Sequence, residues 1–168
     1  MKKRITVAIT GHRDIIETEE IEKAVSLFFE ALIEESQEII LLSPLADGAD
    51  RFVAKIFLKL QKEYSHLRLV VPMPFSKERY MLDFDEASKV EFEELLTQAD
   101  GNFKIPSFGD QPYRGLGKYM VSVSDYLLAL WDGTYNGKAG GTGDVVEYAT
   151  WMDFAELVHI RCERQGSN

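Results

Sequence analysis

The sequence predicts an α/β fold: a three-layer sandwich in which a mostly parallel β-sheet carries helices on both faces. Apolar runs of strand length alternate with stretches whose apolar residues recur at helical spacing, which is typical of β-α-β units. The strand runs are continuously apolar, as in strands buried on both faces. Because 168 residues with 45% hydrophobic content suffice for one core, residues 1–168 are interpreted as a single domain.

The first half of the chain predicts three strands and two helices. The strands are short apolar runs that end at Gly or Pro: Ile5–Thr10, Ile39–Leu42 and Leu67–Val71. A helix is expected over Glu19–Glu35, with Thr18 as its N-cap. A second helix is expected to begin at Asp47 or Gly48.

The second half predicts the remaining elements. The pattern Ser88-x-x-Glu91 indicates a capping box that opens a helix. Residues 100–112 are expected to form an irregular loop with a short strand near 103–105, and 113–123 a weak helix because of its two glycines. A buried strand follows at Tyr126–Trp131, then a helix from about Asp144 to Phe154 and a last strand at Leu157–Ile160.

Composition narrows the class of partner. A formal charge of −9 argues against nucleic acid or an anionic membrane as the main partner. No run approaches the roughly 20 apolar residues of a membrane helix, so a cytoplasmic protein is expected. The single cysteine, Cys162, is interpreted as an inert thiol. His66 and His159 lack ligand-spaced neighbours, so no metal site is predicted.

Ligands of parallel sheets bind beyond the carboxyl ends of the strands, so the loops that leave those ends are the candidate site. The first is Thr10, Gly11, His12 and Arg13, in which Gly11 permits close backbone approach and the polar residues suit a phosphate. The alternative is a tight turn with solvated His12 and Arg13.

The second loop leads into the predicted helix through Gly48, Ala49 and Arg51. An Arg in the first turn of a helix opposes the helix dipole unless an anion offsets it, which favours contact with a ligand phosphate. The alternative is an internal salt bridge from Arg51 to Asp47 or Asp50.

The third loop follows the buried strand and its terminal Asp132. It contains three glycines in four residues, which indicates backbone amides aimed at an anion: Gly140, Gly141, Thr142 and Gly143. A flexible linker is the alternative. Asp144 is expected to cap the next helix or to bind a ribose hydroxyl, and Glu147 follows one turn later.

Aromatic residues near these loops are candidates for the walls of a pocket, with core packing as the alternative for each. Together with nearby polar residues they are Phe75, Tyr80, Asp83, Phe84, Tyr113, Arg114 and Trp131.

These loops resemble those of the SLOG superfamily, a Rossmann-like group that includes the LOG "lysine decarboxylase-like" proteins and the DNA-processing DprA proteins. The matching motifs are Thr-Gly-His-Arg at Thr10–Arg13, Ser-Pro-Leu-Ala-x-Gly-Ala-Asp-Arg at Ser43–Arg51, and the strand Ser124–Gly133 followed by Gly140–Thr142. The resemblance covers residues 5 to about 150. It implies a pocket for a nucleotide or a nucleotide derivative.

The resemblance also bears on activity. LOG enzymes are phosphoribohydrolases with a catalytic Glu three residues after the Thr of Pro-Gly-Gly-x-Gly-Thr-x-x-Glu, a position that Val145 holds here. Nucleoside 2-deoxyribosyltransferases, which this chain resembles more loosely, use a Glu at the same place. The nearest carboxylates, Asp144 and Glu147, are therefore the candidate catalytic residues of an enzyme.

Three hypotheses follow. The first is a sensor or binding module that holds a nucleotide on the three loops and requires no cofactor. The alternative is an N-glycosidic hydrolase or transferase that acts on nucleoside monophosphates through Asp144 or Glu147. The third is a partner-binding protein with a vestigial pocket. A homo-oligomer is expected because the helix that carries Trp151 is apolar.

Overall fold

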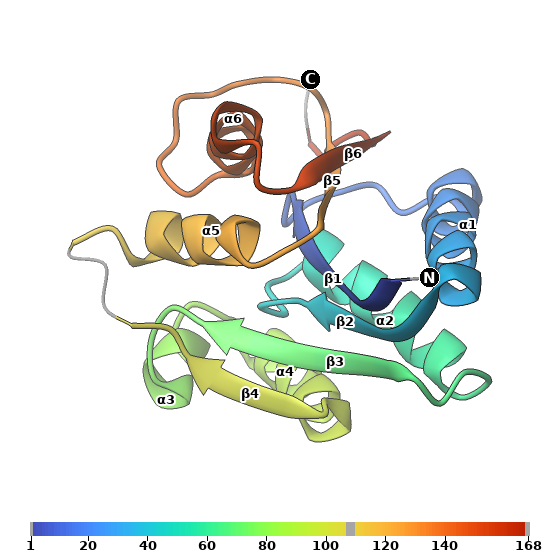
Figure 1. Cartoon of the computed structure of the whole chain (residues 1–168). Helices are drawn as coiled ribbons and strands as arrows, with labels where there is room; N and C mark the ends of the chain where they lie inside the picture. The colour runs from blue at the N-terminus through green and yellow to red at the C-terminus, as the bar shows by residue number, and fades with distance from the viewer. Residues whose placement is uncertain (1, 107–109, 167–168) are drawn as a thin grey trace.

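The computed structural model describes residues 2–106 and 110–166, which form an α/β domain around one six-stranded sheet (Figure 1). The sheet order is β4-β3-β2-β1-β5-β6, and every neighbouring pair is parallel. The strands are β1 (Lys2–Gly11), β2 (Ser36–Leu42), β3 (Leu67–Met73), β4 (Gly101–Lys104), β5 (Tyr126–Trp131) and β6 (Glu156–Arg161). The predicted α/β sandwich is confirmed, and its sheet is parallel throughout.

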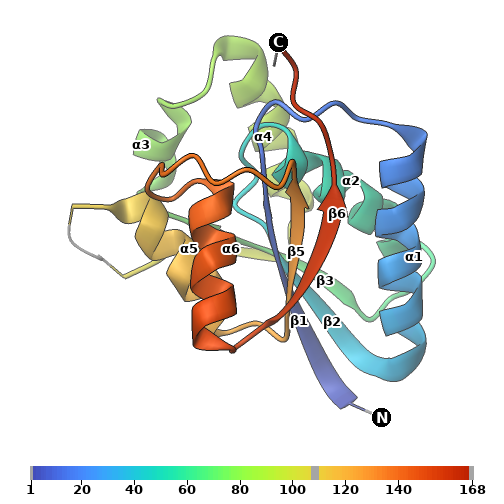
Figure 2. The same ribbon diagram turned by 90° about the horizontal axis from the view of Figure 1, so that it is seen from above.

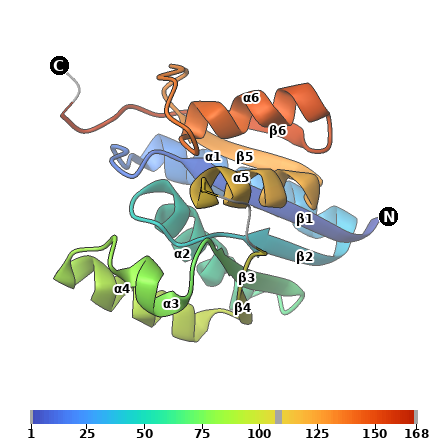
Figure 3. The same ribbon diagram turned by 90° about the vertical axis from the view of Figure 1, so that its left-hand side faces the viewer.

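Helices cover both faces of the sheet, and each face has its own apolar cluster (Figure 2). One cluster joins the sheet to α1 (Glu19–Glu35), α2 (Ala49–Gln61), the short α3 (Lys77–Met81) and α4 (Glu86–Gln98). The other joins it to α5 (Pro112–Ser122) and α6 (Thr142–Met152). Figure 3 shows α3 and α4 beside β3 and β4, at one end of the twisted sheet.

Several boundaries differ from the sequence prediction. The helix assigned to a capping box begins at Glu86, and its N-cap is Asp85, whose carboxylate accepts the Ser88 N–H at 2.8 Å. Ser88 Oγ instead donates to Asp47, which precedes α2, and Glu91 accepts from Arg51 and Lys55 of α2, so the capping-box prediction is wrong. Strand β4 begins at Gly101, and α6 begins at Thr142. The predicted loop over 100–112 includes residues 107–109, which lie outside the described residues.

The topology places a ligand crevice between β1 and β5. From β1 the chain builds β2, β3 and β4 outward in one direction, then returns to place β5 on the other side of β1. The connections therefore leave β1 and β5 in opposite directions, which opens a crevice at their carboxyl ends. Among the described helices, none has both the length and the apolar character that crossing a membrane requires.

Candidate functional site

A cavity of ≈ 420 Å³ opens above the carboxyl ends of β1 and β5. This volume lies within the range of small-molecule pockets. Four segments supply most of its lining: residues 9–14, the β2–α2 loop, one face of α5, and residues 136–145 at the start of α6. The predicted ligand loops thus meet around one cavity.

The first predicted loop lies in this cavity in full, since Thr10, Gly11, His12 and Arg13 all line it. A Cβ on Gly11 would lie 2.3 Å from the Cβ of Ala49 and 2.8 Å from the Leu130 carbonyl, so only glycine fits between α2 and β5. His12 is buried, and its Nε2 accepts the Asp132 N–H at 3.2 Å. The imidazole thus fixes the end of β5 beneath the cavity.

Arg13 is the cation of this loop that remains available to an anion. Its side chain is exposed, and its guanidinium lies 5.7 Å from the centroid of the Tyr113 ring. No described carboxylate lies within ion-pair distance of it. The nearby Asp14 is paired with Arg164 at 2.8 Å instead.

In the second predicted loop, the residues expected to bind phosphate serve structure, and other residues of the loop, Pro44, Ala46 and Asp50, line the cavity. Gly48 and Ala49 are absent from the lining, and the Ala49 N–H donates to the His12 carbonyl at 3.1 Å. Gly48 has φ +81°, and a Cβ there would lie 2.4 Å from the Arg13 carbonyl oxygen. The first loop therefore packs against the start of α2 and accepts a hydrogen bond from the Ala49 amide. Neither Gly48 nor Ala49, which were expected to bind phosphate, lines the cavity.

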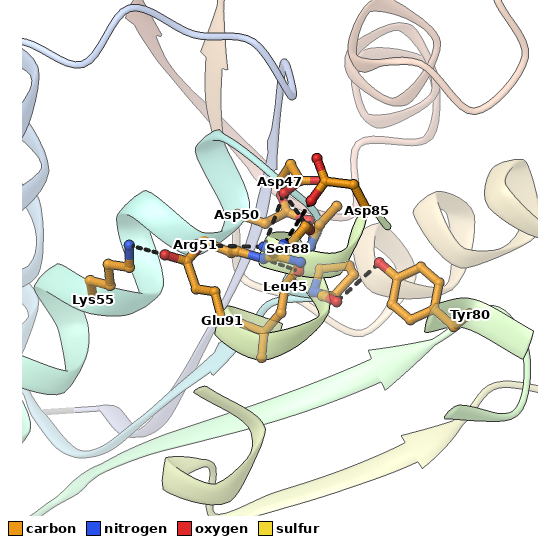
Figure 4. A network of polar contacts seen from close by, with 11 residues as sticks. Leu45, Asp47, Asp50, Arg51, Lys55, Tyr80, Asp85, Ser88 and Glu91 are labelled. Carbon is orange, nitrogen blue, oxygen red and sulfur yellow. Dashed lines mark hydrogen bonds and ion pairs between the residues drawn. The ribbon is translucent and has the colours of Figure 1, made fainter. Parts of the chain in front are cut away.

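Arg51 is likewise turned into the protein, in the network that Figure 4 shows. It is 2% exposed, and its Nε donates to the Leu45 carbonyl at 2.8 Å. Its Nη1 lies 2.9 Å from Asp47 and 3.2 Å from Glu91, while Ser88 Oγ donates to Asp47 at 2.6 Å. The internal salt bridge, the alternative to ligand contact, is what the structure contains.

The third predicted loop reaches the cavity through Gly140, Gly141 and Thr142, whereas Gly143 and Asp132 lie outside its lining. Gly141 is the N-cap of α6 and gives no side-chain cap. Among the described residues, no acceptor serves the amides of Thr142, Gly143 and Asp144. The first turn of α6 therefore presents unpaired N–H groups and the positive end of its dipole.

Asp144 and Glu147 do not line the cavity. Asp144 accepts two bonds from the Arg114 guanidinium, at 2.9 and 3.0 Å, and one from the Gly140 N–H at 2.8 Å. These bonds, above all the one from Arg114, lower the pKa of Asp144. Glu147 is exposed, and Val145 faces the cavity in its place. The two predicted catalytic carboxylates are thus a loop clamp and a surface residue.

The carboxylate that does face the cavity from its buried side is Asp50, which was considered from the sequence only as a partner for Arg51. It is 8% exposed, and one of its oxygens accepts the Ala46 N–H at 3.2 Å. Burial raises the pKa of Asp50 to about 7, against the opposing effects of the Ala46 bond, Arg13 and Arg51. The feature of the sequence that could have indicated Asp50 as a cavity residue is its place in the first turn of the helix that follows β2.

Aromatic and apolar residues complete the walls. Tyr80, Asp83 and Tyr113 line the cavity, as predicted for pocket candidates, whereas Phe75, Phe84, Arg114 and Trp131 do not. The Tyr113 hydroxyl is buried without a hydrogen-bond partner among the described residues. Leu116, Met120 and Val145 form an apolar wall.

Close packing of α5 on α6 shapes this apolar wall, because a Cβ on Gly117 would lie 2.7 Å from Val145 Cγ2. The side chain of Val145 thus packs directly against Gly117 and leaves no room for a side chain at position 117.

Other titratable groups offer no metal site within the described residues, where no group of three His, Cys, Asp or Glu side chains gathers. Burial, with lesser contributions from Asp132 and Asp14, raises the pKa of the Cys162 thiol to about 11. The pKa of Asp132 is lowered: burial acts to raise it, but the bond from the Thr134 N–H and the proximity of His12 and Arg164 outweigh that effect.

Comparisons with known proteins agree with this fold. The YpsA family model, described as the YspA SLOG family, matches residues 7–156. A UPF0398 protein of Halalkalibacterium halodurans is 32% identical over 147 residues, which are 84% of this chain and 73% of the relative. A UPF0398 protein of Bacillus pumilus is 33% identical over 115 residues, 64% of this chain and 58% of the relative. The chain thus spans less than two thirds of that relative's length.

Among solved structures, DNA processing protein A from Helicobacter pylori superimposes with a TM-score of 0.59 at 17% identity, over 98% of this chain and 68% of that protein. The likeness shows a shared fold.

The same match corrects the expectation that nucleic acid is not a partner. The H. pylori protein has a single-stranded DNA binding mode, so this fold is compatible with nucleic acid. Net charge sums the whole surface and does not describe a local one. The lining of this cavity includes the cations Arg13, Lys138 and Arg164 beside the carboxylates Asp14, Asp50 and Asp83, in a chain of net charge −9.

Proposed function

The chain belongs to the YpsA SLOG family, and on that premise we propose that its cavity binds a nucleotide or a nucleotide-derived ligand. The observation that carries the proposal is the meeting of an uncapped helix N-terminus with an unpaired arginine at one cavity. Backbone amides and a guanidinium are the groups that proteins use to hold phosphate.

The phosphate is assigned to the end of the cavity formed by α6. Among the described residues no acceptor serves the Thr142 amide there, the Lys138 side chain is exposed, and Arg13 enters from the first loop. The second loop contributes little to this end because the Ala49 amide is already bonded.

The remaining walls suit the uncharged part of such a ligand. The apolar wall of α5 and Val145 accommodates the face of a base, since stacking and burial of flat rings need apolar surface. Asp50 and the unpartnered Tyr113 hydroxyl offer hydrogen bonds to hydroxyl or amino groups. A ligand with one anionic end and one flat end fits this division.

The test is a thermal-shift and calorimetry panel of nucleoside mono- and diphosphates, cyclic nucleotides and short single-stranded oligonucleotides. Arg13→Gln is expected to lower the affinity for the tightest-binding ligand at least tenfold, which corresponds to about 1.4 kcal/mol of binding free energy. Arg4→Gln is the matched control, because Arg4 is exposed and paired with Glu38 at the start of β1.

A panel with no stabilisation at millimolar ligand contradicts the proposal, since a ligand that binds the folded state must stabilise it. That outcome favours a partner-binding protein with a vestigial pocket. Stabilisation by oligonucleotides alone assigns the site to nucleic acid.

A second candidate is N-glycosidic cleavage, which one observation favours: a cavity carboxyl whose pKa lies near neutrality can both give and take a proton. In this reaction the C1′–N bond breaks as protonated Asp50 gives its proton to the leaving base. Water then forms the new C1′–O bond and returns a proton to Asp50. Asp144 and Glu147 have no part in it.

Free base released from a nucleoside monophosphate by the native protein but not by Asp50→Asn supports this candidate. Glu147→Gln is the control and is expected to retain full activity. Absence of base release across the panel leaves binding as the function.

A further inference from the structure

The carboxylate of Asp50 is a buried acceptor that the protein itself bonds only in part. Its side chain is 8% exposed and lines the cavity from the start of α2. Oδ2 accepts the Ala46 N–H at 3.2 Å, whereas no donor among the described residues reaches Oδ1. Because a buried acceptor is costly to leave unpaired, Oδ1 marks a position to which a ligand can donate a hydrogen bond.

The polar groups closest to Asp50 are bonded within the protein. Tyr80 also lines the cavity near Asp50, and its hydroxyl donates to the Pro44 carbonyl at 3.0 Å. Arg51, the next residue along the chain, donates from Nε to the Leu45 carbonyl at 2.8 Å. The free oxygen of Asp50 is therefore the buried acceptor that this end of the cavity offers to a ligand.

The topology indicates which part of a nucleotide reaches Asp50. Strands β2 and β5 lie on either side of β1, so the helices that follow them begin about 10 Å apart, twice the spacing of neighbouring strands. The proposed phosphate position is at the start of α6, and Asp50 lies in the first turn of α2. A 5′-phosphate and the hydroxyls of its own ribose span a comparable distance once a hydrogen bond is added at each end.

The base of the same ligand has a different wall. Leu116, Met120 and Val145 line the cavity and belong to the apolar cluster under α5 and α6, whereas α2 packs on the opposite face of the sheet. A ring on this wall leaves the ribose between the end of β1 and Asp50. In dinucleotide-binding α/β folds, an acidic residue downstream of the first strand-helix turn accepts a hydrogen bond from a ribose. Asp50 follows β2, the strand paired with β1.

We infer that Asp50 accepts hydrogen bonds from the 2′- and 3′-hydroxyls of the ligand's ribose, so that the cavity selects a ribonucleotide over its deoxy forms. The inference rests on the proposed nucleotide binding and names the class of nucleotide. An analogue without these hydroxyls leaves a buried acceptor unpaired, which is a contact that discriminates strongly between ligands. The inference also differs from the cleavage candidate, in which the same carboxyl faces the leaving base.

Calorimetry with the native protein is the first test. The probes are the 5′-mono- and diphosphates of adenosine, guanosine, cytidine and uridine, each beside its 2′-deoxy, 3′-deoxy and 2′,3′-dideoxy analogues. The measurement is made at pH 8, above the pKa of about 7 of Asp50, so that the carboxylate is ionised. For the tightest-binding ribonucleotide, each missing hydroxyl is expected to lower the affinity at least tenfold.

The second test repeats these titrations with Asp50→Asn. Its affinity for the ribonucleotide is expected to fall at least tenfold, while its affinity for the dideoxy analogue stays within threefold of the native value. Glu147→Gln is the matched control, because it neutralises an exposed carboxylate that does not line the cavity and should keep the native preference. Melting temperatures of both variants confirm that they fold.

The outcomes separate this inference from the proposed function. Equal affinity of the native protein for a ribonucleotide and its dideoxy analogue overturns the inference, while nucleotide binding stands. A preference that Asp50→Asn retains also overturns it, because another residue then contacts the ribose. Equal losses for both ligands in Asp50→Asn place the carboxyl at the base or phosphate and overturn it as well. If no probe binds, the proposed function fails and the inference falls with it.

Discussion

The loops before α2 and α6 begin from similar sequence patterns and end in opposite states. Each has a glycine directly ahead of a helix that follows a buried strand. Before α2, the Ala49 amide is bonded to His12, Arg51 is buried in ion pairs, and Gly48 fits against the Arg13 carbonyl. Before α6, the first-turn amides have no described acceptor, and Lys138 is exposed.

The difference teaches that a glycine loop ahead of a helix can offer its amides to a phosphate only where those amides stay unpaired. In the second loop the folded chain supplies its own acceptor, a carbonyl from the first loop, and this bond positions Arg13 at the cavity. The α2 loop thus supports the cavity, and the α6 loop is the proposed contact surface. Substitutions in the first should reduce stability, and substitutions around the second should reduce binding.

The largest contrast is expected between two glycines. Gly48→Ala should lower the free energy of unfolding by about 3 kcal/mol, because the new Cβ meets a backbone carbonyl in a left-handed conformation. Gly141→Ala, at φ −74°, should cost less than about 1 kcal/mol. Urea denaturation of both variants measures the difference, and equal losses would remove the distinction between the loops.

The next contrast is between two arginines. Arg51→Gln should destabilise by about 2 kcal/mol, because it removes the buried bond to the Leu45 carbonyl and one of the bonds that each of Asp47 and Glu91 accepts. Arg13→Gln should stay within about 0.5 kcal/mol in stability yet lose ligand affinity. Denaturation measures the stability of both variants, and calorimetry measures their ligand affinity. A loss of affinity confined to Arg51→Gln would show that Arg51, and not Arg13, contacts the ligand.

A third prediction uses the raised pKa of Asp50. Between the ordinary pKa of 3.8 and the folded value of about 7, the folded protein holds a proton that the unfolded chain has lost. Stability should therefore fall as pH rises through this window, by up to about 1.4 kcal/mol per pH unit, and level off above it. Asp50→Asn should abolish this slope, gaining on the native protein at pH 8 but not at pH 4. The free energy of unfolding of both proteins, measured across this pH range, checks the prediction. A pH slope that is the same in Asp50→Asn as in the native protein would contradict a protonated Asp50.

The smallest effect is expected at Asp144. Asp144→Asn weakens the clamp on Arg114 and Gly140, which should cost about 1 kcal/mol, while nucleotide affinity should change less than in Arg13→Gln. Calorimetry beside denaturation measures both quantities. A complete loss of binding would restore Asp144 as a ligand residue.

The sequence by itself determined the architecture and the edge of the sheet at which the cavity lies. Continuous apolar runs such as Tyr126–Trp131 can be satisfied only by burial on both faces, and parallel strands gather their carboxyl ends on one edge. The cavity therefore forms where the motifs at Thr10–Arg13 and Gly140–Thr142 predicted it.

Only the tertiary structure decided which polar groups remain free to bind. Whether Ala49 or Thr142 keeps a free amide depends on which carbonyl lies near it, and that carbonyl comes from a distant segment. Likewise Arg51 pairs with Glu91, 40 residues away in the chain, whereas its neighbour Asp50 faces the cavity and has a raised pKa. Local patterns fix the elements because backbone geometry is local. The partners of polar groups are set by packing, which joins residues far apart in the chain.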